Sequence, residues 1–123
     1  MNRNCAKLEL RATFFDSPHG LMNNLSRSTA YDIAKLCAVC LEDSRFVKIV
    51  TTKYYKVPKT QINKNFQSYH WENTHRLIGQ KGVISIKTGV TNSAGPCLAT
   101  AVEMENENLI IVVLGCKDMD CRW

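Results

Sequence analysis

Three consecutive residues, Lys87, Thr88 and Gly89, combine chemical groups that suit the binding of a peptide with a free carboxylate. A lysine ammonium places a fixed positive charge where a carboxylate or a proton-transfer network can use it. A threonine hydroxyl can donate a hydrogen bond to the same carboxylate. The glycine leaves the strand edge without a side chain, so a peptide could pair there as an extra strand. We therefore expect this run to lie at the end of a strand that binds a peptide.

Two sequence patterns suggest zinc chemistry, but their spacing is wrong for it. In HWENTH, His70 and His75 are five positions apart, whereas zinc proteases use two histidines four apart with the glutamate beside the first. The zinc deaminase pattern fails too, because Thr100 stands where the second cysteine after Cys97 would be. We expect no metal in either place.

The six cysteines favour reduced, mostly buried side chains over disulfides. Cys37 and Cys40, together with Cys116 and Cys121, could form a zinc site with four thiolates. However, Cys37 falls on the apolar face of a predicted helix. We therefore expect neither a metal nor another cofactor.

The apolar pattern predicts helices first and an antiparallel sheet afterwards, which is an α+β arrangement. The helices are expected at residues 1–10 and from Ser28 or Thr29, the candidate N-caps, to Leu41. Residues 46–57 predict a helix end followed by a strand. The last three strands are expected at Val83–Thr88, Cys97–Met104 and Leu109–Gly115. The continuous apolar run of the last strand suggests burial on both faces, which needs layers above and below the sheet that so short a chain need not supply.

Size and charge exclude several classes of protein. With 123 residues, 45% of them hydrophobic, the chain is long enough for one domain. Its net charge of +5 comes from dispersed basic residues, including Lys53, Lys56, Lys59 and Lys64 in a polar connection, so we expect no nucleic-acid partner. We find no transmembrane run and no signal-peptide pattern after Met1, which leaves the cellular location open.

Several segments resemble, in order, the D-alanyl-D-alanine carboxypeptidases, which are low-molecular-weight penicillin-binding proteins of the serine β-lactamase-like superfamily. They are MNRNCAKLEL, TFFDSPHGL, STAYDIAKLC, FVKIVTTKYYKV, ENTHRLIGQKGV and IKTGVTNSAGPCLATAVEMENENLIIVVLG. The resemblance covers nearly the whole chain. It implies that residues 1–123 form part of a transpeptidase-like domain, the C-terminal half of the catalytic domain, with helices packed on an antiparallel sheet.

The resemblance also implies a reaction, which is removal of the terminal D-alanine from a cell-wall peptide through an acyl-enzyme on serine. Lys87, Thr88 and Gly89 are then the candidate catalytic residues that line the substrate strand. Thr88 and the backbone N–H of Val90 are the candidate substrate-binding groups, the latter as an oxyanion donor. The implied ligands are a cell-wall peptide or a β-lactam.

Two motifs that this chemistry needs are absent from the chain. None of its seven serines is followed by lysine three positions later or by asparagine two positions later, so the Ser-x-x-Lys and Ser-x-Asn motifs are both missing. We therefore expect no activity from the chain alone, and self-association through an exposed edge and face of its sheet. The alternative is a non-catalytic peptide-binding or scaffold protein derived from the same family.

Overall fold

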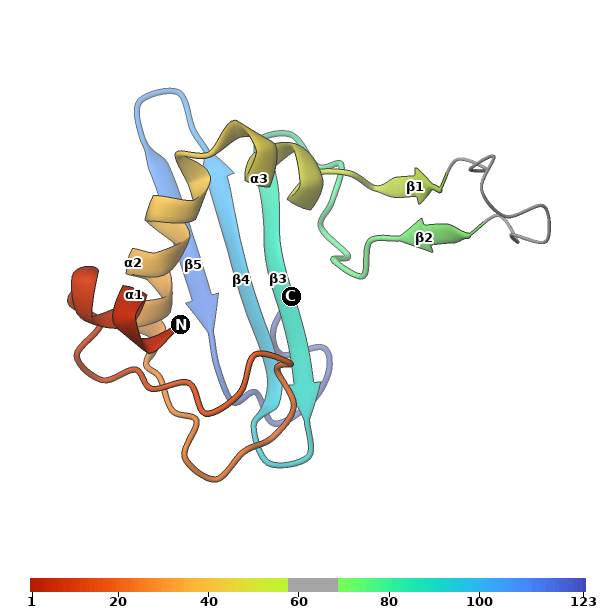
Figure 1. Cartoon of the computed structure of the whole chain (residues 1–123). Coiled ribbons are helices and arrows are strands. Elements are labelled where there is room, and N and C mark those ends of the chain that lie inside the picture. Colours follow the sequence, from red (N-terminus) through yellow and green to blue (C-terminus); the bar gives the residue numbers. More distant parts are fainter. Residues whose placement is uncertain (58–68) are drawn as a thin grey trace, which may run out of the picture.

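The computed structural model describes residues 1–57 and 69–123, and Figure 1 shows helices beside one antiparallel sheet, as expected. Strands β3, β4 and β5 form this sheet in that order, and β1 and β2 form a separate two-stranded ribbon that projects from it. Lys59 and Lys64, expected in a solvated loop, lie outside the described residues. The elements are α1 (Asn2–Lys7), α2 (Ala30–Leu41), α3 (Ser44–Val50), β1 (Tyr54–Lys56), β2 (His70–Glu72), β3 (Val83–Thr91), β4 (Gly95–Glu103) and β5 (Asn108–Val113).

Helix α2 begins where the sequence predicted it. Thr29 is the N-cap, and its hydroxyl accepts a hydrogen bond from the backbone N–H of Asp32 at 3.2 Å. The Asp32 carboxylate is buried and accepts hydrogen bonds from the N–H of Ala12 at 2.9 Å and the hydroxyl of Thr13 at 2.7 Å. These bonds fix the segment that follows α1 against the start of α2.

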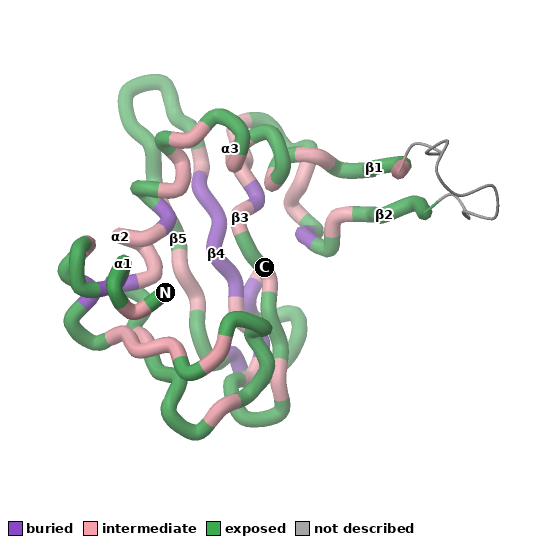
Figure 2. Tube along the Cα trace, viewed as in Figure 1, coloured by how far each residue is buried: buried purple, intermediate pink, exposed green. Residues whose placement is uncertain are grey.

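The centre of the core is β4. Leu98, Ala99, Thr100 and Ala101 are consecutive and all buried, which means that both faces of this strand are covered (Figure 2). Helix α2 packs against β5 and β4 and contributes the buried Cys37, as its apolar pattern predicted. The sheet is thus held from one side by α2.

The burial on both faces that the apolar run of β5 suggested is not observed within the described residues, in keeping with the expectation that so short a chain need not supply both layers. Leu109 is 49% exposed and Ile111 is 37% exposed, and side chains two apart lie on the same face of a strand. Ile110 and Val112, which point to the other face, are half-buried. The continuous apolar run predicted two covering layers, whereas the described residues supply cover on one face.

Other boundaries also differ from the prediction. The first helix ends at Lys7 instead of residue 10, because the chain turns back through Glu9, whose φ is 53°, and Leu10 donates its N–H to the carbonyl of Cys5 at 2.9 Å. Strand β3 continues to Thr91 and β4 begins at Gly95. The ribbon partner β2 was not predicted, because its three residues are too few to show an alternating pattern.

Candidate functional site

The lysine-threonine-glycine run lies in the middle of β3 and not at its end as predicted. Pairing with β4 continues past Gly89, with Val90 opposite Pro96 and Thr91 opposite Gly95. Within the described residues, β3 pairs with β4 alone, so its other edge has no strand beside it. An edge of this kind presents backbone N–H and C=O groups that can pair with an added strand.

Lys87 and Thr88 are brought together with Thr74, which precedes β3 in the chain. The hydroxyl oxygens of Thr88 and Thr74 are 2.8 Å apart, and the Lys87 ammonium donates a hydrogen bond to the carbonyl of Thr88. The strand is irregular here, since its register with β4 shifts between Ser85 and Lys87. A hollow of about 120 Å³ lies over this point and is lined by Asn73, Thr74, His75, Ser85, Ile86, Lys87 and Thr88.

Gly89 is exposed and open to the surroundings. A methyl group built on its α-carbon would meet no other atom within 4 Å, and its φ is not in the left-handed region. The fold of the described residues therefore does not require glycine at this position. Val90, the next residue, is 58% exposed.

Arg122, a buried arginine that the sequence did not indicate, supports strand β3. Arg122 is 7% exposed and donates hydrogen bonds from Nη1 to the carbonyls of Gly89 at 3.0 Å and Cys97 at 3.2 Å. Its guanidinium lies 4.8 Å from the ring centre of Trp123. Because it bridges β3 and β4 at Gly89, Arg122 fixes the backbone that carries the candidate site. It has no sequence signal, since it is a single basic residue far from the motif.

His75, on the wall of the hollow, is 2% exposed and packs edge-on against Trp123, with ring centres 5.2 Å apart. Neither of its ring nitrogens has a hydrogen-bond partner among the described residues. Burial, and then the positive charge of Arg122, lower the pKa of His75 below 6.5. The ring is therefore neutral in the folded chain at neutral pH.

We expect acid to destabilise the fold through His75. Because its pKa is lowered, His75 binds fewer protons in the folded state than in the unfolded state as the pH falls. The stability contributed by the neutral ring is therefore fully present above about pH 6.5 and is lost as the pH falls through the folded pKa. The measurement is the urea unfolding midpoint between pH 7.5 and 5. In His75→Gln the fall should be shallower than in the unchanged chain, and an identical fall would refute the assignment. His19→Gln, at an exposed histidine, is the matched control.

Two of the cysteine thiols, Cys37 and Cys116, are poorly suited to replace the missing serine as a nucleophile. The hydrogen bond with Cys121 and burial raise the pKa of Cys116 to about 11. Burial, with the neighbouring Cys40, raises the pKa of Cys37 to about 11. A thiol with such a pKa is protonated and unreactive at neutral pH. Among the residues that the structure describes, no three His, Cys, Asp or Glu side chains could hold a metal ion.

The fold and the edge strand define a class of protein, the serine transpeptidase-like domains. A Streptomyces DD-transpeptidase of known structure superimposes with a TM-score of 0.88 at 30% identity, over 98% of this chain and 47% of its own. Penicillin-binding protein D2 of Listeria monocytogenes, solved in a cefotaxime-bound form, gives a TM-score of 0.80 at 25% identity over 98% of this chain and 48% of its own. The chain therefore has the predicted α+β fold of part of such a domain.

The sequence comparisons define the family. The family profile described as D-alanyl-D-alanine carboxypeptidase matches residues 1–118. Curated carboxypeptidases of that name are 31% identical, in a Streptomyces species, and 34% identical, as DacF of Bacillus subtilis. The alignments cover 99% and 94% of this chain but 43% and 29% of the relatives. The chain belongs to the D-alanyl-D-alanine carboxypeptidase family and spans less than half the length of these members.

No helix in the described parts of the chain is long and apolar enough to cross a lipid bilayer.

The family is one of penicillin-binding serine peptidases that act on peptidoglycan, and the resemblance seen in the sequence is confirmed.

Proposed function

We propose that this chain binds the carboxyl end of a cell-wall peptide, or a β-lactam, along the free edge of β3, as the substrate-side part of a serine-type D-alanyl-D-alanine carboxypeptidase. The observation that carries the proposal is the open space at Gly89, on an edge of β3 that has no neighbouring strand among the described residues. A glycine that its own fold does not require leaves room for an external backbone.

In this proposal the site residues take separate roles. The Lys87 ammonium and the Thr88 hydroxyl hold the terminal carboxylate, since both line one hollow. Gly89 leaves space for the peptide backbone, and the N–H of Val90 is one oxyanion donor. Residues 1–123 bind without turnover, because no Ser-x-x-Lys or Ser-x-Asn motif accompanies these groups.

Binding at β3 is tested by filling the open space. In Gly89→Val, diacetyl-L-lysyl-D-alanyl-D-alanine should bind at least about tenfold more weakly by NMR titration, because the added side chain occupies the position of the peptide. The free energy of unfolding should change by no more than about 0.5 kcal/mol, since no atom lies within 4 Å of the new Cβ.

Asn108→Val is the matched control, because it adds the same side chain at the start of β5 on the opposite edge of the sheet. Equal peptide affinity in both variants and the unchanged chain would refute binding at β3. A folded chain that binds the peptide specifically and leaves it intact would also fit the alternative function, a non-catalytic binding or scaffold protein.

We also propose that residues 1–123 fold as one partial domain that self-associates through the exposed face of β5. Leu109 and Ile111 lie together on this face, and apolar side chains on an edge strand favour pairing between copies. Light scattering after gel filtration should show dimers or larger species. The variant Leu109→Lys with Ile111→Lys should shift them to monomer, and an unchanged distribution would exclude this face.

A further inference from the structure

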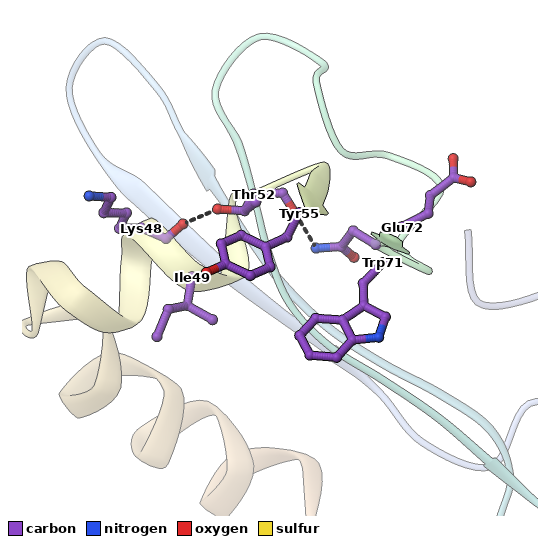
Figure 3. A pocket seen from close by; sticks show the side chains of 7 residues that line it. Lys48, Ile49, Thr52, Tyr55, Trp71 and Glu72 are labelled. Carbon is purple, nitrogen blue, oxygen red and sulfur yellow. Dashed lines mark hydrogen bonds between the residues drawn. The ribbon is translucent and has the colours of Figure 1, made fainter. Parts of the chain in front are cut away.

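A second concave site lies away from β3, between α3 and the β1–β2 ribbon (Figure 3). Its volume is about 450 Å³, which is in the range of small-molecule sites. The role proposed for the lysine-threonine-glycine run does not involve it. The groove is lined by Lys48, Ile49, Thr52, Tyr55, Trp71, Glu72 and Asn73.

Two aromatic rings provide a flat surface in this groove. Tyr55 and Trp71 are directly opposite each other in the ribbon, and their rings stack with centres 6.0 Å apart and planes 18° from parallel. Tyr55 is 51% exposed and Trp71 is 60% exposed. Such rings offer a broad apolar surface at little cost in side-chain entropy, which is typical of binding surfaces.

The side of the groove formed by α3 is held in place before any ligand binds. The Asn73 amide donates hydrogen bonds to the carbonyls of Val50 at 3.1 Å and Thr52 at 3.2 Å, which ties the end of β2 to the end of α3. Ile49, a side chain of α3, also lines the groove and is 71% exposed (Figure 3). Lys48, on the same helix, carries the one ammonium among the lining residues.

We propose that this groove binds a pyranose sugar that carries an N-acetyl group. The C–H bonds on one face of a pyranose ring have a partial positive charge and favour the negative face of an aromatic ring. The open side of the groove leaves the sugar hydroxyls in water, and the acetyl methyl group packs on Ile49. This ligand uses the aromatic and the aliphatic surfaces together.

Charge and shape argue against two other ligands. A nucleic acid needs a row of cations beside the aromatic rings on which its bases stack. The Lys53 ammonium instead lies 5.4 Å from the ring centre of Tyr54, which alternates with Tyr55 along the strand. Lys56 also alternates with Tyr55 and so lies on the other face of the ribbon. A membrane surface favours protruding aromatic side chains, whereas Tyr55 and Trp71 line a concave site.

The groove adjoins the hollow over Lys87 and Thr88, because Asn73 lines both. A ligand with both a sugar and a peptide could therefore contact the two sites. The inference does not depend on this, and sugar binding is measured without any peptide, so its failure is distinct from failure of the proposed function.

The test titrates the full chain with tri-N-acetylchitotriose and follows binding by saturation-transfer NMR and calorimetry. The unchanged chain should bind this probe, while Trp71→Ala and Ile49→Glu should each weaken binding about tenfold or more. Ile49→Glu guards against loss of the ribbon in the first variant, because it changes an exposed side chain of α3. Tyr54→Ala is the matched control, on the other face of the ribbon, and should bind like the unchanged chain.

The same titration is repeated with three comparison ligands, which are maltotriose, an oligothymidylate and vesicles of anionic phospholipid. Binding of maltotriose as tight as that of the acetylated probe would overturn the role assigned to the acetyl group. Trp71-dependent binding of the oligonucleotide or the vesicles, without sugar binding, would overturn the proposal in favour of those ligands. The absence of sugar binding at millimolar probe would overturn it outright.

Discussion

A fluorescent penicillin is expected to leave the purified chain unlabelled on a denaturing gel, and the intact mass should stay that of the chain alone. Covalent capture of a β-lactam needs an activated nucleophile. Neither the serine of a Ser-x-x-Lys motif nor its lysine is present in residues 1–123. In the proposed function Lys87, Thr88 and Val90 bind a β-lactam, and we expect them to bind it without attacking it.

The expected effect is large, because removing the nucleophile of a serine hydrolase costs about a millionfold in turnover. The pKa values of the Cys37 and Cys116 thiols are raised to about 11, so these two side chains carry little thiolate at neutral pH. A full-length penicillin-binding relative labelled in parallel is the positive control, and circular dichroism establishes that the sample is folded. An adduct of penicillin mass on the folded chain would contradict the prediction, and peptide mapping would then identify the reactive residue.

Local signals in the sequence were enough to predict much of the fold. Thr29 followed by Asp32 marks the start of α2, and the spacing of Ile33, Cys37 and Leu41 gives its buried face. The β4–β5 hairpin was predicted from two apolar runs around a polar turn. The exposure of Leu109 and Ile111 could be anticipated only from the short length of the chain, because an apolar run shows that a strand favours burial but not which layers cover it.

The candidate site was predicted only in part, because residues distant in the sequence also contribute to it. Lys87, Thr88 and Gly89 are adjacent in the chain, and the structure brings Lys87 and Thr88 together over one hollow. Their roles in binding stay a prediction. Thr74 and Arg122 were missed as neighbours of this run, because they approach it through tertiary contacts of 14 and 33 positions in sequence. The stacked pair of Tyr55 and Trp71 was missed because strand β2 was not predicted.

Gly95, the glycine at the start of β4, has a structural explanation, which leads to the second large prediction. Gly95 begins β4 with a φ of 66°, in the left-handed region that side chains disfavour. A Cβ at this position would lie 2.7 Å from the carbonyl oxygen of Cys116. That carbonyl belongs to backbone held against β4, since the N–H of Cys116 donates to the carbonyl of Pro96 at 3.0 Å.

Gly95→Val should therefore lower the free energy of unfolding by about 3 kcal/mol or more, because backbone strain and a backbone clash add at one position. That is a large share of the 5–15 kcal/mol typical of a domain, so we expect little soluble protein. The measure is the urea unfolding midpoint, and for Gly95→Ala it should lie between those of Gly95→Val and the unchanged chain. Gly89→Val is the matched control: the same side chain in the same hairpin, placed in open space, should leave the midpoint unchanged. Equal midpoints for Gly95→Val and Gly89→Val would show that the close approach of Cys116 to Gly95 does not constrain the fold. The expected difference would separate the two glycines of this hairpin, one required by the fold and the other left for a ligand.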